Sequence, residues 1–169
     1  MRGKKPRQRC NNIDPEDIDP AFGHWLAGFV DGEAHFMFSM RQGSPEARLS
    51  IELRSDDHPL LVEVQRTLGI GTIIHHKNRA RGNQHASDRW HVSALHDCLW
   101  LARLFELYPL RSKKARDFEV WSAAIRAWAN GAGKNDLRDY AERIRATRQF
   151  DATPTASVPA PDAVQNPLL

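Results

Sequence analysis

The stretch from Trp25 to Met40 constrains the fold more than any other part of the chain, because its hydrophobic period changes at one point. Before Gly32 the apolar residues recur at helical spacing. After it, Phe36 and Phe38 alternate with more polar neighbours, as in a strand with one buried face. The pattern predicts a helix that runs into a strand with no spacer between them.

The predicted helix begins at Pro20, which fits the first helical position, and Asp19 can accept hydrogen bonds from the free N–H groups of its first turn. We expect the helix to reach about Val30 and to stop at Gly32. A second helix backbone could approach closely along the small residues of this segment, which are Gly23, Ala27 and Gly28.

Two carboxylates, Asp31 and Glu33, stand where this helix meets the strand. A negative side chain at a helix C-terminus opposes the helix dipole at a cost of about 0.3–1 kcal/mol. A bound divalent cation would reverse that penalty. In the alternative interpretation Asp31 caps a turn and Glu33 is solvated, and the local physics does not decide between the two.

The nine residues from Leu26 to Ala34 resemble the signature of the LAGLIDADG homing endonucleases, and the first eight fit it closely. Ala34 stands where the family usually has a second glycine, and Glu33 stands where aspartate is more common. The resemblance implies that Glu33 is a catalytic carboxylate that binds metal, with the Gly32 carbonyl as a second ligand. It also implies that Asp31 is a structural residue of the helix end.

The resemblance spans about residues 19–130 and includes one copy of the motif. Family members with one motif are homodimers whose motif helices pack at a twofold axis, which implies a dimer interface at Gly23, Ala27 and Gly28. The implied activity is a Mg²⁺-dependent double-strand break with short 3′ overhangs in a long, pseudo-palindromic DNA target. Mn²⁺ is the expected substitute, and Ca²⁺ should support binding without cleavage. The gene is expected to lie in a mobile intron or intein.

The rest of the chain completes an α+β fold with the order αββαββα, a curved antiparallel DNA-binding sheet backed by helices, and further C-terminal helices. A turn at 42–45 joins the first two strands. The other expected elements are a strand at 49–54, a helix opening at 56–59 and ending before Gly69, strands at 72–77 and 88–94, and helices at 96–108, 112–130 and 135–150.

One face of the predicted sheet is polar, and no helix is expected to cover it. Such side chains suit the major groove of DNA, where they can reach base edges and phosphates. A simply solvated face is the alternative, since antiparallel sheets commonly have one. The predicted DNA-binding residues are His35, Met37, Ser39, Arg41, Ser50, Glu52, Arg54, Thr72, Ile74, His76, Arg79, Arg81, Arg89 and His91.

A dense basic turn, from Arg111 to Lys114, stands at the start of a later helix. Positive charges there oppose the dipole unless a phosphate lies nearby. By resemblance, a basic residue after such a Pro-Leu turn acts at the catalytic site. Lys113 is the first candidate, with Arg111 and Lys114 as alternatives. The family also has a polar residue near the end of the second strand, where Arg54 or Ser55 would have to serve.

The two ends of the chain differ in composition from the body, which we expect to be one domain at residues 13–150. Residues 1–12 carry +5 and are expected to form a flexible basic arm, while residues 151–169 carry −2 and resemble a disordered tail. The net charge of +3 therefore leaves the body near zero. DNA binding would need a basic face balanced by acids elsewhere.

The cysteines, Cys10 and Cys98, have no paired spacing, and the histidines match no zinc pattern. These features favour a soluble protein of a reducing, intracellular compartment, either a bacterial cytoplasm or an organelle. No apolar run approaches the length of about 20 residues that spans a bilayer, so no membrane partner is expected.

Three other functions remain compatible with the sequence. An RNA maturase would bind intron RNA to assist splicing, and a cleavage-dead regulator would bind DNA only. Retention of Glu33 argues against a dead site. A protein-interaction module would use the bare sheet face for a protein partner, and its binding would depend less on salt than binding to a nucleic acid.

Overall fold

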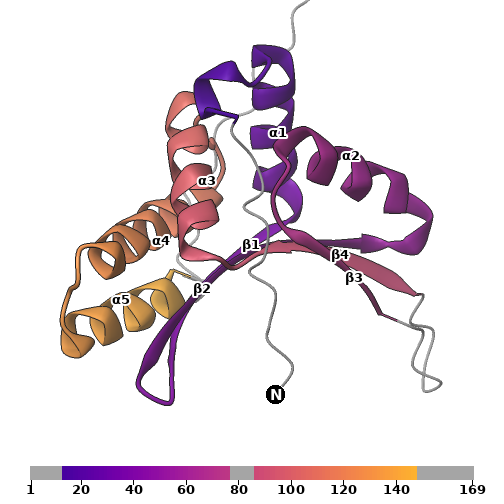
Figure 1. The fold of residues 1–169 in the computed structure, drawn as a ribbon. Helices are drawn as coiled ribbons and strands as arrows, with labels where there is room; N and C mark the ends of the chain where they lie inside the picture. Colours follow the sequence, from indigo (N-terminus) through magenta and orange to yellow (C-terminus); the bar gives the residue numbers. More distant parts are fainter. Residues whose placement is uncertain (1–12, 77–85, 148–169) are drawn as a thin grey trace, which may run out of the picture.

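The computed structural model of the protein describes residues 13–76 and 86–147. The chain alternates helices and strand pairs in the predicted order (Figure 1). Its elements are the 3₁₀ helix η1 (Pro15–Asp17), α1 (Pro20–Glu33), β1 (Ala34–Arg41), β2 (Ser44–Arg54), the 3₁₀ helix η2 (Ser55–Asp57), α2 (His58–Leu68), β3 (Thr72–His76), β4 (Ser87–Val92), α3 (Leu95–Leu107), α4 (Lys114–Ala129) and α5 (Lys134–Ala146).

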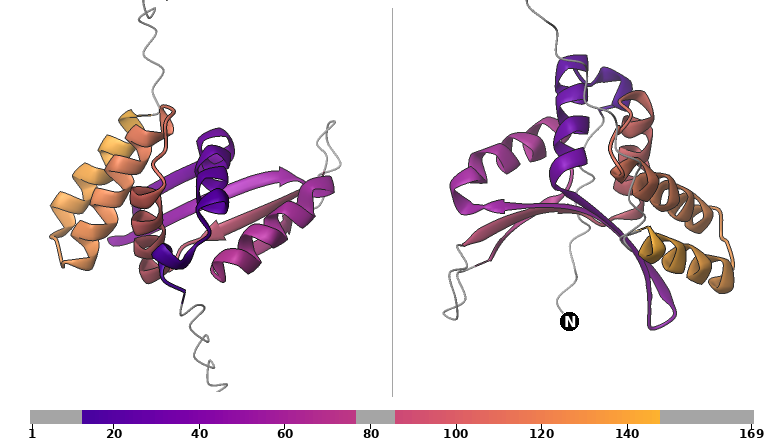
Figure 2. Two further views of the ribbon diagram at one scale, coloured as in Figure 1. Left: turned by 90° about the horizontal axis from the view of Figure 1, so that it is seen from above. Right: turned by 180° about the vertical axis from the view of Figure 1, so that it is seen from behind.

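The four strands form one antiparallel sheet in the order β1-β2-β4-β3. The sheet bends like an arch, and the described helices all lie on its convex side (Figure 1). Helix α1 stands over the middle of the arch, with α2 on one side and α3, α4 and α5 on the other (Figure 2). The predicted α+β fold with a curved, half-open sheet is therefore confirmed.

The core lies between the sheet and the helices. Its fully buried side chains include Leu26 and Val30 of α1, Trp90 of β4 and Trp121 of α4. The Trp121 ring lies 5.2 Å from that of Phe36, and its Nε1 donates to the Met37 carbonyl oxygen at 3.2 Å. Both tryptophans therefore belong to the core.

Helix α1 is longer than predicted, because it continues past Val30 and through Gly32 to Glu33. The Ala34 N–H still donates to the Val30 carbonyl oxygen, so the helical pattern persists until the strand begins. Glu33 is therefore the last residue of the helix. Asp19 caps the other end as predicted, with its carboxylate accepting from the Phe22 N–H at 3.0 Å.

The first hairpin is tighter than predicted. Its turn contains only Gln42 and Gly43, which both have positive φ, as type I′ turns require. Pro45, expected in the turn, belongs to β2 and pairs with Met40. The strand tolerates a proline because β4 pairs with β2 only at residues 49–54, so Pro45 has a neighbouring strand on one side alone.

The later elements shift by a few residues. Strand β4 is Ser87–Val92 where 88–94 was predicted, and α5 begins one residue early. The predicted arm and tail lie outside the described residues. Within the two described ranges, no helix has the length and apolarity needed to cross a bilayer.

Candidate active site and nucleic-acid interface

The carboxylate of Glu33 faces a hollow on the concave side of the sheet. The side chain is exposed at the end of α1, and no side chain among residues 13–76 and 86–147 donates a hydrogen bond to it. The hollow has a volume of about 330 Å³ and is lined by Glu33, His35, Met37, Arg48, Ser50, Glu52 and Arg89. One carboxylate thus remains available to a ligand at this corner.

Asp31, two residues earlier, is occupied by the chain that enters α4. Its Oδ2 accepts from the Arg111 N–H at 2.7 Å, and its Oδ1 accepts from the Ser112 N–H at 3.2 Å and the Ser112 hydroxyl at 2.8 Å. These donors offset the unfavourable position of a carboxylate at a helix C-terminus. The two acids therefore differ in role, since Asp31 joins two segments and Glu33 remains open.

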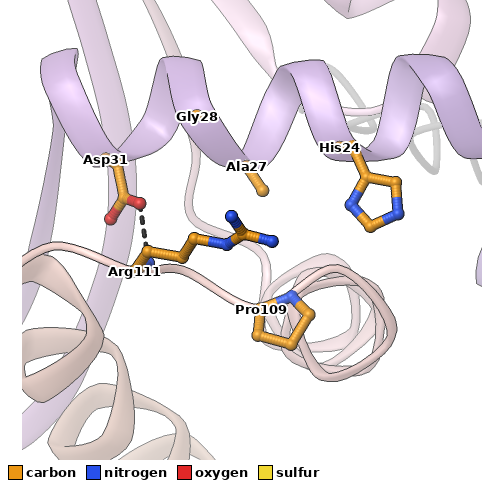
Figure 3. A pocket seen from close by; sticks show the side chains of 6 residues that line it. All are labelled: His24, Ala27, Gly28, Asp31, Pro109 and Arg111. Carbon is orange, nitrogen blue, oxygen red and sulfur yellow. Dashed lines mark hydrogen bonds between the residues drawn. The ribbon is translucent and has the colours of Figure 1, made fainter.

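The basic turn presents its cations in different directions. The Lys114 ammonium donates to the carbonyl oxygen of Ala34, the residue that follows Glu33. Lys113, the first candidate from the sequence, is exposed at the N-cap of α4. The Arg111 side chain runs back along α1 toward Ala27 (Figure 3). The structure thus brings Lys114, rather than Lys113 or Arg111, to the acidic corner.

Arg54 lies at the end of β2 and is not among the residues that line the hollow around Glu33. Its guanidinium forms an exposed ion pair with Asp56 at 3.2 Å. The prediction of Arg54 as a catalytic neighbour therefore has no contact in the structure that supports it.

The concave side of the sheet lies opposite the helices (Figure 1). The burial pattern along the strands places the predicted polar face on this side. Its rows are fixed by the strand register: His35, Ser50, His91 and Thr72 form one row, and Glu52, Arg89 and Ile74 form the next. In β1, Phe36 and Phe38 lie on the buried side, and Met37, Ser39 and Arg41 of the predicted set lie on the other side. His76 of β3 also belongs to the predicted set. Arg79 and Arg81 lie outside the described residues.

Arg48 also belongs to this face, although the alternating pattern predicted a strand that begins at Leu49 and so did not include it. It pairs with Met37 and lines the hollow at Glu33. The Nε atom of Arg48 and the Nε2 atom of His76 are buried, and neither has a hydrogen-bond partner among the described residues. Buried polar atoms are normally satisfied, so the Arg48 Nε–H favours a ligand with an acceptor group on this face, whereas His76 Nε2 can donate or accept according to its tautomer.

Glu52 and Arg89 form an ordered ion pair in the middle of the concave face. Arg89 donates from Nε at 2.9 Å and from one terminal nitrogen at 2.5 Å to the same Glu52 oxygen. The Ser87 hydroxyl donates to the other oxygen at 2.6 Å. The hydrogen bond from Ser87, followed by that from Arg89, lowers the pKa of Glu52.

Asp88 is buried on the opposite, helix-facing side of the sheet. His75 of β3 donates to one of its oxygens at 2.7 Å, and His58 at the start of α2 donates to the other at 3.1 Å. Burial by itself raises the pKa of Asp88, but hydrogen bonds from groups such as His75 and His58 outweigh burial and lower it. Strand alternation alone does not predict this contact between three elements.

The outer face of α1 differs from the predicted dimer interface. Gly23 is buried against Tyr108, and a Cβ at Gly23 would lie 2.5 Å from that ring, while Ala27 is 4% exposed. Gly23 serves the chain's own core, so the prediction that it contacts a second helix is corrected. Ala27 packs in the core and also lines the groove beside α1, so its contact with a second helix stays a prediction. Gly28 remains on the outer surface with open space around it, as does Gly32 one turn later.

An aromatic side chain accompanies these open glycines. Trp25 is 40% exposed and stacks on Phe29, with 5.3 Å between the ring centroids. Beside it runs a groove of about 360 Å³, lined by His24, Ala27, Gly28, Asp31, Pro109 and Arg111 (Figure 3). The outer face of α1 therefore carries an exposed aromatic side chain at Trp25 and has no side chain at Gly28 and Gly32.

The donors at the acidic corner fit a hard cation only in part. Among the described residues no three acidic, histidine or cysteine side chains cluster as a metal site. Glu33 offers carboxylate oxygens, and the Gly32 carbonyl lies in the last helical turn, where carbonyls lack helical partners. Oxygen donors with several positions left for water or phosphate are typical of Mg²⁺ sites. Cys98 is not a rival ligand, since burial raises its pKa to about 12.

The fold and this corner define a class of protein: an α+β chain that presents a polar, arched sheet with one open carboxylate at the end of a central helix. The sequence profile of the LAGLIDADG endonuclease family matches residues 26–125. The chain belongs to the LAGLIDADG endonuclease family.

Individual relatives agree with this assignment. A probable intron-encoded endonuclease of Neurospora crassa is 28% identical over 115 residues, which cover 68% of this chain and 24% of that protein. The LAGLIDADG meganuclease I-AabMI, solved bound to uncleaved DNA, is 27% identical with a TM-score of 0.55, over 64% of this chain and 37% of the meganuclease.

An archaeal intron-encoded homing endonuclease, solved in complex with DNA, shares the fold with a TM-score of 0.65 at 18% identity, over 78% of this chain and 87% of that one. The chain thus spans about a quarter of the curated relative and about a third of the meganuclease, but most of the archaeal protein.

Proposed function

We propose that this protein is a site-specific homing endonuclease that makes a metal-dependent double-strand break, with short 3′ overhangs, in a long pseudo-palindromic DNA. The observation that carries the proposal is the open Glu33 carboxylate, which ends α1 beside a hollow in the polar concave sheet. The family and the DNA-bound relatives supply the substrate class.

Glu33 and the Gly32 carbonyl would hold Mg²⁺ at this corner in each subunit. When bound, the metal supplies activation of a water and stabilisation of the leaving 3′-oxygen. Lys114 lies beside the corner through its bond to the Ala34 carbonyl and would stabilise negative charge that develops on the phosphate. Asp31 holds the segment before α4 against α1, which positions Lys114.

The concave face would lie in the major groove. It carries the predicted DNA-binding residues of the described strands together with Arg48. The buried Arg48 Nε–H would gain an acceptor from a base or phosphate, and His76 Nε2 would gain a hydrogen-bond partner. Both DNA-bound relatives share the fold that forms this face.

The active form would be a homodimer. At the acidic corner, the described part of the chain offers one open carboxylate, Glu33, whereas cutting two strands needs one site for each. Gly28 and Gly32 would let the α1 helices of two copies approach closely, and Trp25 would become buried beside them. A C2 arrangement brings both Glu33 residues to the middle of the target and makes that target approximately palindromic.

The test compares the wild type with Glu33→Gln, and uses Glu63→Gln on the exposed surface of α2 as the matched control. Glu33→Gln should abolish DNA cleavage in Mg²⁺ and retain DNA binding in Ca²⁺, while the control cuts normally. Binding should weaken steeply between about 50 and 200 mM salt, because phosphate contacts release counterions.

Three other outcomes of these binding and cleavage measurements would favour the alternative functions. A wild type that binds DNA but never cuts would favour a regulator, and one that binds only intron RNA would favour a maturase. Binding that ignores salt would favour a protein-interaction module.

A further inference from the structure

The row Glu52, Arg89 and Ile74 crosses three strands of the concave face, next to the hollow at Glu33. Glu52 of β2 is the direct partner of Arg89 in β4, which in turn is the direct partner of Ile74 in β3. Neighbouring strands are about 4.8 Å apart, so the three side chains form one short line. Glu52 and Arg89 also line the hollow itself.

The ion pair leaves one edge of the Arg89 guanidinium open. Glu52 accepts from Nε and from one terminal nitrogen, which are the two donors on the side edge of the planar group. The end edge still offers one N–H from each terminal nitrogen. Two parallel N–H groups of this kind match the O6 and N7 acceptors of guanine in the major groove.

Glu52 is better suited to hold Arg89 than to read a base. Both of its oxygens are engaged, one by Arg89 and one by the Ser87 hydroxyl at 2.6 Å. Ser87 and Arg89 of β4 both hold the Glu52 carboxylate in place, and the carboxylate in turn holds the plane of the Arg89 guanidinium. An arginine orientated before binding loses less side-chain freedom on contact with a base than a free one.

Ile74 supplies a different kind of contact beside Arg89. It is 42% exposed, and it stands on the polar side of the sheet. Among the described residues, Trp25, Ile74 and Leu107 are the large hydrophobic side chains with this exposure, and Ile74 is the member of this set in a strand. In the major groove the apolar feature of a base pair is the thymine methyl group.

On the basis of the proposed function, we propose that this row is a two-base reader: Arg89, orientated by Glu52, reads a guanine, and Ile74 contacts the methyl group of a thymine at the next base pair. Arg89 and Ile74 are then specificity-determining residues, and Glu52 is a positioning residue. Each half of the target would contain this G and T at one fixed place.

The experiment is selection of bound DNA from a randomised duplex library by the full chain in Ca²⁺. Five variants run beside the wild type: Arg89→Lys, Arg89→Ala, Ile74→Ala, Glu52→Gln and the control Arg66→Lys on the exposed surface of α2. Sequencing of the enriched DNA gives the base preference at every position, and a salt titration on the best target gives the phosphate contribution.

The wild type should prefer guanine at one position of each half-site by about tenfold, with thymine favoured at the adjacent pair. Arg89→Lys should lose the guanine preference and keep the salt dependence, because lysine keeps the positive charge but lacks the two parallel N–H donors of the guanidinium. Ile74→Ala should lose only the thymine preference. Glu52→Gln should weaken the guanine preference, with preferences elsewhere unchanged, as in Arg66→Lys.

Unchanged preferences in Arg89→Lys and Arg89→Ala would overturn the reader while leaving the endonuclease proposal intact. Equal loss of preference at all positions would also overturn it, since that result indicates a general structural role. Failure of the wild type to enrich any DNA would overturn both the reader and the proposed function.

Discussion

The Asp31 and Glu33 side chains show how neighbouring acids acquire different roles from their surroundings. Asp31 accepts three hydrogen bonds of 2.7–3.2 Å from Arg111 and Ser112, whereas Glu33 has no described donor. The difference arises from the helical rotation between them, which turns Asp31 toward the chain that enters α4 and Glu33 toward the concave side. Spacing in the sequence does not distinguish them.

The same corner separates the two lysines of the basic turn. Lys114→Met should reduce cleavage by about a hundredfold or more while DNA binding in Ca²⁺ changes little, because the side chain stabilises charge that forms only during the reaction. Lys113→Met is the matched control and should cut within a fewfold of the wild type. Single-turnover cleavage rates on one duplex target measure both, and a larger loss in Lys113→Met would contradict the assignment.

Helix α1 has two glycines with opposite environments. Gly23→Ala should lower the free energy of unfolding by about 1–3 kcal/mol, because its Cβ would overlap the Tyr108 ring, which is held in place by a hydrogen bond to Ile18. Gly28→Ala has open space and should be neutral or gain up to about 1 kcal/mol within one chain. Urea unfolding at low protein concentration compares them, and equal effects would show that Gly23 is not packed as described.

Asp88 joins α2, β3 and β4, so its ionisation should affect how firmly α2 and the β3–β4 pair are held. The folded-state pKa is lowered from the ordinary value of 3.8, so its stabilisation is complete above that pH and is lost as pH falls below it. Asp88→Asn should therefore unfold more easily at pH 7, by about 2 kcal/mol, and show a shallower loss of stability in acid.

Chemical unfolding at several pH values measures this dependence. Asp56→Asn, which removes an exposed partner of Arg54, is the control and should change stability by less than about 0.5 kcal/mol. An identical acid dependence in Asp88→Asn and the wild type would contradict the contribution of this carboxylate.

The element pattern could be predicted from the sequence to a large extent. The period change after Gly32 predicted the junction of α1 and β1, and alternation predicted which side chains of β1 are buried. Boundaries failed where strand pairing decided them. Pro45 lies in β2 because it pairs with Met40 of β1, and the same early start of β2 includes Arg48. Lys114 contacts Ala34, which is 80 positions away, and Asp88 contacts His58 and His75, which are 30 and 13 positions away. Local sequence patterns contain no information on contacts over such separations.

In the whole molecule, the described helices leave the concave face of the arched sheet and the outer face of α1 uncovered (Figure 1). Trp25→Glu should therefore weaken self-association by introducing a charge at the proposed twofold axis, while the fold of each chain is retained. Sedimentation of wild type and variant at micromolar concentration without DNA checks this. A wild type that remains a monomer under those conditions would contradict the homodimeric active site.

The catalytic role of Glu33 is tested most directly by cleavage of a randomised palindromic plasmid library in Mg²⁺, with wild type and Glu33→Gln side by side and the cut ends sequenced. We expect ends with half-site symmetry and 3′ overhangs from the wild type, and none from Glu33→Gln. Cleavage by both proteins at the same sites would contradict the role of Glu33 and, with it, the proposed catalytic centre.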